Sequence, residues 1–296
     1  MNIILGGTGQ VGSAVARALL RRGEPVTVVV RHPYKAEDLR RSGAEIAVAD
    51  IGDAAGLRAV FRAGSRAFLL VPNGDPAGDA DRHQRLYVDA IIEALAGSGL
   101  EKVVAASTYG ARPGGPCGDL TVLYGFEEKL RAMPVQAVIN RAAYYMSNWS
   151  GMAGSVLAEG VLPSFFPEGF SLPMVAPEDV GEAAARRLVD EAGDTDMGYV
   201  EGPRAYTPRD VADAFSDVTG RPVVVNVIPR ESWEEVFVQS GFSQATAQSY
   251  ACMTSAVLDG SMETPRNPAR GTTELRDYIR RALGSAPDNS GRNGAS

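Results

Sequence analysis

The chain has 296 residues, 45% of them hydrophobic and 22% charged, which is long enough for a full core and typical of a globular protein. Its formal net charge of -7 argues against nucleic acid as the main ligand, because phosphate backbones require a dense Lys and Arg surface. We therefore expect a small-molecule partner and no nucleic acid.

The composition also bears on location and redox state. No apolar run reaches the roughly 18 residues that a membrane helix needs, and early glycines leave no room for a signal peptide. Cys117 and Cys252 are too few for a disulfide scaffold and match no metal spacing. We expect a cytoplasmic protein in a reducing compartment, with both cysteines as small structural residues, no metal site and no membrane partner.

The first half of the chain alternates between strand and helix patterns. A strand at 2–5, a helix at 11–22 and a β-branched strand at 25–30 form one strand–helix–strand unit. The elements that follow are helices near 35–42, from 53, near 79–97 and near 119–132, and strands at 45–48, 66–71, 102–106 and 135–140. Six strands separated by helices predict a Rossmann-type, doubly wound parallel sheet in an α/β fold.

The second half loses this rhythm and predicts a smaller α/β lobe on the substrate side. Its expected elements are helices at 144–157, 177–191 and 208–219, an irregular segment at 162–177, a strand at 223–228, and helices from Glu231, Ser243 and Thr272. We thus divide the chain into a nucleotide-binding domain at 1–142, a lobe at 143–283, and a tail at 284–296 whose composition predicts disorder.

The loop Gly6-Gly7-Thr8-Gly9-Gln10-Val11-Gly12 joins the first strand to the first helix. A glycine triplet alone is a weak motif, but its place in a strand–helix–strand unit is the context that confirms dinucleotide binding. The free N–H groups of the helix would face the pyrophosphate. The cofactor-binding candidates of this loop are Gly6, Thr8, Gly9, Gln10, Val11 and Gly12.

Arg31 follows the second strand, where an NAD-binding chain usually carries an acid. Arginine can grip a 2′-phosphate with two hydrogen bonds, and Lys35 adds charge one turn further on. This pair favours NADP(H), unless it is only a solvated basic surface. Further cofactor candidates lie at the ends of the third and fourth strands: Asp50, Ile51, Val71, Pro72 and Asn73.

Several segments share a family pattern, namely residues 6–12, 28–31, 68–72, 140–148 and 173–181. Together they resemble the NmrA-like group of atypical short-chain dehydrogenases, which includes NADPH-dependent quinone oxidoreductases and NADP(H)-sensing regulators. The resemblance implies that Arg141, at the end of the sixth strand, lies against the cofactor. In this family Arg-Pro-Gly usually stands there, whereas here Ala142 and Ala143 follow the arginine.

A standard short-chain dehydrogenase uses a Ser, a Tyr, and a Lys one helical turn after the Tyr. Ser107 and Tyr124 can fill the first two places, but Glu128 stands in the third. Lys129 lies about 140° around the helix from Tyr124 and should face elsewhere. We therefore predict that the usual Tyr-Lys pair is absent, with Tyr124 and Ser107 as catalytic candidates and Ser107 also near the cofactor.

Aromatic residues gather after the sixth strand and could hold a flat, quinone-like substrate, or could form core between the lobes. The substrate-binding candidates are Tyr109, Tyr124, Tyr144, Asn148 and Trp149. Three functions remain open: a reductase of a quinone, enone or related carbonyl, an NADP(H) sensor that binds a protein partner, and a cofactor-binding isomerase or cyclase. Either a monomer or a homodimer fits the sequence.

Overall fold

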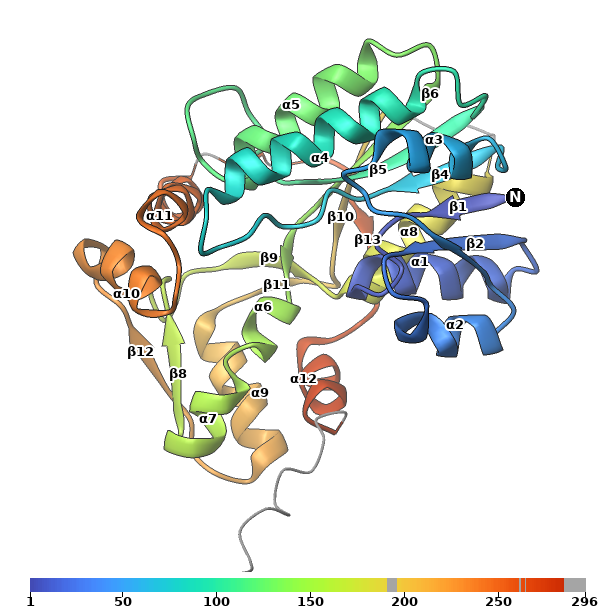
Figure 1. Ribbon diagram of the computed structural model, residues 1–296. Coiled ribbons are helices and arrows are strands. Elements are labelled where there is room, and N and C mark those ends of the chain that lie inside the picture. Colours follow the sequence, from blue (N-terminus) through green and yellow to red (C-terminus); the bar gives the residue numbers. More distant parts are fainter. Residues whose placement is uncertain (191–195, 261, 264, 285–296) are drawn as a thin grey trace, which may run out of the picture.

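The computed structural model describes residues 1–190, 196–260, 262–263 and 265–284. Its centre is an eight-stranded, fully parallel sheet in the order β13-β10-β6-β5-β4-β1-β2-β3 (Figure 1). Its strands are β1 (Asn2–Ile4), β2 (Val26–Val30), β3 (Glu45–Val48), β4 (Arg66–Leu69), β5 (Lys102–Thr108), β6 (Gln136–Ala142), β10 (Met197–Glu201) and β13 (Ala269–Arg270). The run β3-β2-β1-β4-β5-β6 is the strand order of a doubly wound Rossmann sheet.

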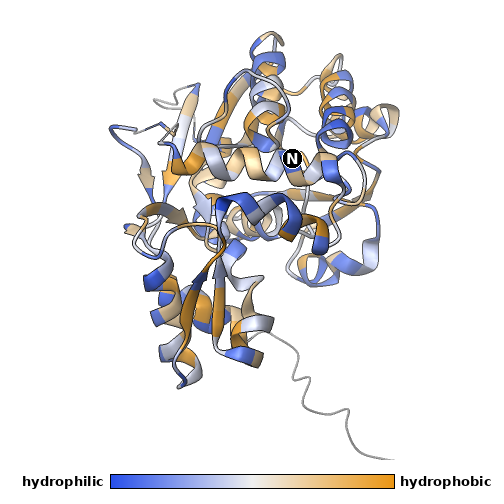
Figure 2. Ribbon diagram, turned by 90° about the vertical axis from the view of Figure 1, so that its left-hand side faces the viewer, coloured by the Kyte–Doolittle hydropathy of each residue, from blue (hydrophilic) through white to orange (hydrophobic). Residues whose placement is uncertain are grey.

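Helices cover both faces of this sheet (Figure 1). One face carries α1 (Gln10–Arg21) and α8 (Pro177–Val189), with the short η1 (Pro33–Ala36) and α2 (Glu37–Arg41) nearby. The other face carries α3 (Ala54–Phe61), α4 (Ala80–Leu95) and α5 (Asp119–Arg131). In Figure 2 these helices show both apolar and hydrophilic stretches, as expected of helices with one buried side.

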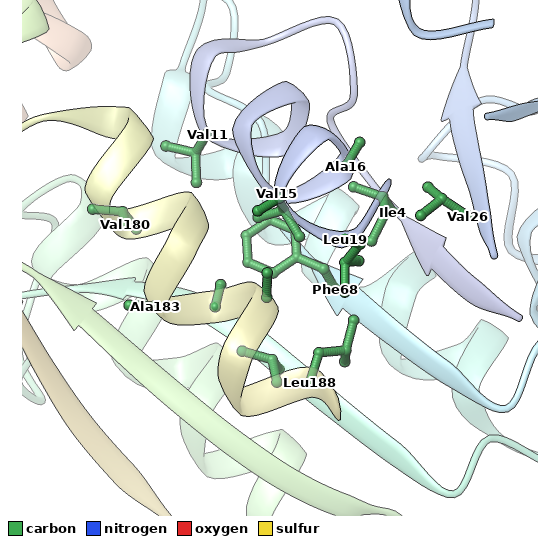
Figure 3. Close-up of a cluster of buried hydrophobic side chains, with 14 of the residues drawn as sticks. Ile4, Val11, Val15, Ala16, Leu19, Val26, Phe68, Val180, Ala183 and Leu188 are labelled. Atoms are coloured by element: carbon green, nitrogen blue, oxygen red, sulfur yellow. The ribbon is translucent and has the colours of Figure 1, made fainter. Parts of the chain in front are cut away.

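Helix α1, which begins directly after the glycine loop, packs closely against α8 (Figure 3). Val15 and Leu19 of α1 meet Val180 and Leu188 of α8 over the Phe68 ring of β4, and all five side chains are buried. The two helices approach closely, because a Cβ atom on Gly181 of α8 would collide with Ala14 of α1. This contact holds α1 in place, and with it the N-terminus that would face a bound phosphate.

The rest of the second half forms a separate lobe with its own apolar cluster. Its strands are β7 (Tyr144–Tyr145), β9 (Leu172–Val175) and β11 (Ala205–Tyr206) in one small sheet, and β8 (Val161–Ser164) and β12 (Val224–Val227) in another. Its helices are α6 (Ser147–Ser150), α7 (Ala153–Glu159), α9 (Pro208–Thr219), η2 (Arg230–Ser232), α10 (Trp233–Gln239), α11 (Gln244–Leu258) and α12 (Leu275–Gly284). None of the helices over the described residues is long and apolar enough to cross a membrane.

The expected fold class is confirmed, and the second half required corrections. The helix predicted over 144–157 was wrong at its start, because Tyr144 and Tyr145 pair with β9 before the chain becomes helical. Two strands from beyond residue 142, β10 and β13, join the large sheet and extend the six predicted strands to eight. Gly284 closes α12, and the rest of the predicted tail, 285–296, lies outside the described residues.

The expectation for the cysteines was also wrong, because Cys117 and Cys252 form a disulfide with their Cα atoms 5.2 Å apart. They are separated by 135 residues, and only the packing of α11 near the start of α5 brings them together. The inference of a reducing compartment rested on two cysteines being too few for a disulfide scaffold, and the disulfide removes that basis.

Candidate functional site

The glycine loop lies at the carboxyl end of β1 and leads directly into α1. Gly6 has a φ of +67°, a left-handed conformation that favours glycine. A Cβ atom would collide with Val28 if placed on Gly7, and with the Gly6 carbonyl oxygen if placed on Gly12. A Cβ atom on Gly9 would meet only that same oxygen, at 3.3 Å. Backbone conformation therefore explains Gly6, and packing explains Gly7 and Gly12, whereas neither requires glycine as strongly at Gly9.

The N-terminus of α1 has the properties of an anion site. Gly9 is its N-cap residue and provides no side-chain cap, and the first turn contains no acidic residue. The first N–H groups of a helix have no partner within the helix and carry the positive end of its dipole. The uncapped turn and the open side of Gly9 thus fit a pyrophosphate, with Thr8, Gln10 and Val11 in the same loop.

Arg31 lies directly after the fully buried β2 and is exposed to solvent, as is Lys35 in η1. Among the described residues, neither side chain has an ion pair or a hydrogen bond. Tyr34 between them is 71% exposed, and its ring centroid lies 5.7 Å from that of His32. Two unpaired cations beside exposed rings suit an adenosine phosphate, and sequence reasoning had not included the rings.

The other predicted cofactor residues lie in two further loops at the same edge of the sheet. Asp50 is exposed after β3, and its Oδ1 accepts a hydrogen bond of 2.7 Å from the Gly52 N–H. Ile51 is half-buried beside it. After β4, Val71 is buried in the core, Pro72 is half-buried and Asn73 is exposed. The exposed pair, Asp50 and Asn73, is available to a ligand.

Ser107 and Arg141 are paired residues on the adjacent strands β5 and β6, and both contact Glu127 of α5. The Ser107 hydroxyl donates to Glu127 Oε1 at 2.5 Å. The Arg141 guanidinium donates to both carboxylate oxygens, with distances of 2.9 Å from Nε and 2.7 Å from Nη2. Glu127 is fully buried, and the other two are nearly so. The structure therefore places both predicted side chains in a buried ion-pair network.

This network extends to the segment that follows α11. The Arg141 Nη1 also contacts Glu263, whose Oε2 accepts a hydrogen bond of 2.5 Å from the Gly110 N–H. Burial lowers the pKa of Arg141, but the hydrogen bonds and charge of Glu127, followed by the charge of Glu263, outweigh this effect and raise it. The guanidinium is permanently charged and ties β6, α5 and Glu263 together.

Tyr109 lies in the main core rather than beside the other predicted substrate residues. Its hydroxyl donates to Glu201 Oε1 at 2.9 Å, and Glu201 also pairs with Arg270 at 2.6 Å. Burial, reinforced by Glu201, raises the pKa of Tyr109. The hydroxyl is thus held in its neutral form by a buried carboxylate.

Tyr124 is half-buried on α5 and has no hydrogen bond with the described residues. Lys129 forms an ion pair with Asp89 of α4, and Glu128 pairs with Arg131 on its own helix at 2.5 Å. The lysine ammonium is thus engaged on the side of α5 that faces α4.

Tyr144, Asn148 and Trp149 come together at the start of the second lobe. The Tyr144 ring lies 5.9 Å from Trp149 and 5.6 Å from Phe166, measured between centroids. Burial raises the pKa of Tyr144 to about 12, although its hydrogen bond with the Asn148 side chain acts in the opposite direction. Trp149 is nearly buried, and its indole N–H has no hydrogen-bond partner among the described residues. Trp149 and Phe166 belong to the apolar cluster of the second lobe and are each 3% exposed, and Tyr144 packs against that cluster and is half-buried. The rings therefore act mainly as core of this lobe, with Tyr144 at its edge.

Glu127 is the residue that sequence reasoning missed. The sequence could have revealed it, because its helical spacing places Glu127 on the same face of α5 as the buried Leu120, Leu123 and Leu130. A charge on such a face requires a partner, and Arg141 at the end of a buried strand supplies one. Both charged residues can be read from the sequence, but their contact can be seen only in the structure.

Comparisons with known proteins find relatives along most of the chain. The chain is 24% identical to an NAD(P)H azoreductase of Xenophilus azovorans over 294 residues, covering 97% of this chain and 100% of the relative. It is 26% identical to quinone oxidoreductase 2 of Escherichia coli (strain K12) over 226 residues, covering 75% of this chain and 76% of the relative.

Solved structures show the same fold. An NADPH-dependent quinone oxidoreductase of Escherichia coli complexed with NADPH superposes with a TM-score of 0.75 at 22% identity, covering 96% of this chain and 100% of the other. The Citrobacter sp. triphenylmethane reductase complexed with NADP(H) gives 0.78 at 19% identity, with the same coverage. The model of the NmrA-like family matches residues 2–263. The chain therefore belongs to the NmrA-like family.

Proposed function

We propose that the protein is an NADPH-dependent oxidoreductase that reduces a quinone, an enone or a related carbonyl compound. The observation that carries the proposal is the uncapped N-terminus of α1 with the open side of Gly9, close in the fold to the end of β2. There Arg31 and Lys35 have no anionic partner among the described residues, which suits the 2′-phosphate of NADP(H). When bound, this cofactor supplies a hydride to the substrate.

The substrate class is supported by the half-buried ring of Tyr144, which lies at the edge of the apolar cluster that contains Trp149 and Phe166. Flat, conjugated molecules pack well against such rings. The relatives named for azo, quinone and triphenylmethane reduction point to conjugated acceptors in the same way.

We further propose that reduction proceeds without a Tyr-Lys pair. Lys129 is engaged by Asp89, and the Ser107 hydroxyl is held by Glu127, so neither is poised to activate Tyr124. The chain then mainly orients the two reactants, and the proton comes from Tyr124 acting as a weak donor or from water. Reduction of a quinone tolerates such a weak donor, because the cofactor carries the difficult step.

The test is NADPH oxidation, followed at 340 nm, with a panel of quinones, enones and azo compounds. We expect turnover with at least one acceptor. Tyr124→Phe should reduce kcat/KM by about tenfold or less, below the roughly 10²–10⁴-fold typical of an activated general acid. The control is Lys129→Ala, which should leave kcat/KM almost unchanged. A loss of about a thousandfold in Tyr124→Phe would restore a conventional tyrosine mechanism.

The second candidate, an NADP(H) sensor that binds a protein partner, is favoured by one observation. Ser107 and Arg141, two residues that could act on a ligand, are both committed to Glu127. Tight NADPH binding measured by calorimetry, without oxidation by any acceptor of the panel, would support the sensor and contradict the reductase.

A further inference from the structure

Helix α11 of the second lobe lies across two loops of the nucleotide-binding body. It contacts the loop after β4, where the Thr246 hydroxyl donates to the Gly78 carbonyl oxygen at 2.8 Å, and the start of α4, where the Ala80 N–H donates to Thr246 at 3.1 Å and the Ser249 hydroxyl donates to Asp81 at 2.7 Å. It also contacts the loop after β5, where the Gly118 N–H donates to Ser249 at 2.9 Å. Ligands of doubly wound sheets bind at the carboxyl ends of these strands. The position of α11 therefore bears on the shape of the site.

The disulfide lies within this contact. Cys117 immediately precedes Gly118, the N-cap residue of α5, and Cys252 is on α11. The packing around the bond is tight, because a Cβ atom on Gly118 would collide with the Met253 sulfur. Cys117 is 3% exposed, whereas Cys252 is only half-buried. A reductant can therefore approach the bond from the α11 side.

We propose that Cys117–Cys252 is a reversible redox site that fixes α11 on the loops after β4 and β5 and so sets the substrate end of the site. The covalent bond makes the contact permanent in the oxidised protein. In the reduced protein the hydrogen bonds of Ser243, Thr246 and Ser249 and local packing hold it without the covalent bond. Local contacts of this kind open and close without global unfolding.

The reaction is a thiol–disulfide exchange with a dithiol reductant, such as a protein with a Cys-X-X-Cys pair. Its thiolate attacks Cys252 Sγ, the S–S bond breaks, and Cys117 leaves as a thiolate. The second thiol of the reductant then displaces Cys252 from the mixed disulfide. The reductant ends as a disulfide, and both protein thiolates take up protons. A disulfide oxidant reverses the sequence.

The expected effect is greatest at one end of the site. Residues that would bind the adenosine end follow β2 and β3, on the far side of β1 and β4 from β5. The loops that α11 touches follow β4 and β5. Reduction should therefore change the KM for the electron acceptor more than the KM for NADPH, which only the loop after β4 links to α11. This kinetic part rests on the proposed reductase function.

The first experiment does not depend on activity. The full chain, purified without reductant, should expose no reactive thiol in denaturant, and should expose both after treatment with tris(2-carboxyethyl)phosphine. Peptide mapping of the oxidised protein should find Cys117 linked to Cys252. After reduction and desalting, amide hydrogen exchange over 244–258 should accelerate by about tenfold or more, as expected for local opening. Two free thiols in the untreated protein, or unchanged exchange after reduction, would overturn the proposal.

The second experiment compares kinetics of the oxidised and the reduced, desalted protein. We expect the acceptor KM to rise by about fivefold or more on reduction, a typical size for coupling between sites. The variant C117S/C252S should match the reduced protein in both KM and exchange, and should not respond to reductant. Ser255→Ala, one turn along α11 with both cysteines intact, should behave like the parent. An acceptor KM equal in both states would refute the regulatory role. Absence of turnover would contradict the proposed reductase function only. The redox site would still be tested by the change in hydrogen exchange on reduction.

Discussion

Residues in one short loop are glycine for different physical reasons. Gly6 needs its left-handed backbone, and Gly12 allows α1 to pass close to the strand, so both would be expected even in a loop that binds nothing. Gly9 has ordinary backbone geometry, and a Cβ atom there would meet a single close neighbour, the Gly6 carbonyl oxygen at 3.3 Å. Its lack of a side chain is therefore the feature of this loop that points most directly to a ligand.

Gly9→Val tests this interpretation without disturbing the core. The new side chain would occupy the space over the first turn of α1 and block the close approach of a pyrophosphate. We expect NADPH binding, measured by calorimetry, to weaken by more than about a hundredfold, equivalent to roughly 2.7 kcal/mol. Gly154→Ala on α7, where a Cβ atom meets nothing within 4 Å, is the control for folding. Unchanged affinity in a folded Gly9→Val protein would show that no dinucleotide binds there.

Arg31→Ala tests the choice between the two nicotinamide cofactors. A hydrogen bond to a charged group contributes about 1.5–3 kcal/mol, so the affinity for NADPH should fall roughly tenfold to a hundredfold. The affinity for NADH should barely change, because it has no 2′-phosphate. Arg40→Ala, which removes a nearby exposed arginine paired with Glu37, should alter neither. Equal losses for both cofactors would show that Arg31 does not recognise the phosphate.

At the scale of elements, Glu127 joins α5 to both β5 and β6. Its carboxylate is fully buried and receives hydrogen bonds from Ser107 and Arg141. Placing a charge there costs desolvation energy, which Arg141 at 2.7 Å and Arg131 at 3.3 Å offset. Glu263 shares the same arginine, so the network also anchors the segment after α11. The network thus joins four stretches of chain, namely β5, α5, β6 and the segment after α11.

Glu127→Ala should therefore destabilise the protein strongly, because it leaves Arg141 charged and buried without its main partner. Breaking such a pair typically costs about 3–5 kcal/mol of unfolding free energy, measurable by urea denaturation. Glu128→Ala, the adjacent residue with a solvent-exposed partner, should cost no more than about 1 kcal/mol. If both variants lost a similar, small amount of unfolding free energy, water or a rearrangement would have to stabilise the charge of Arg141 in place of Glu127.

Elements formed by a local pattern could be predicted, and those formed by distant pairing could not. Thr207 and Gly220 mark the ends of α9 in the sequence, and the structure shows a capping box at one end and a left-handed glycine at the other. β10 is short, half-buried and contains Gly198, so it becomes a strand only by pairing with β6 and β13. The Glu127 network and the disulfide likewise join residues that no local pattern relates.

At the scale of the whole molecule, the chain passes between its two parts several times. We propose a nucleotide-binding body of residues 1–142 completed by α8, β10 and β13, and a substrate lobe formed by the other elements of 143–283 (Figure 1). The lobe is therefore attached by several connections and by the disulfide between the loop before α5 and α11.

The disulfide should contribute to global stability, because it closes a long loop. A cross-link across 135 residues restricts the unfolded chain, and a native disulfide of this kind contributes about 2–4 kcal/mol. The variant C117S/C252S should lose that amount in urea denaturation, relative to the oxidised parent. Its m-value should rise, because the open chain exposes more surface on unfolding. The reduced parent should match the variant, which separates loss of the bond from effects of the serines. Equal unfolding midpoints and m-values for the oxidised and reduced parent would contradict this account, since a bond that restricts the unfolded chain must alter both.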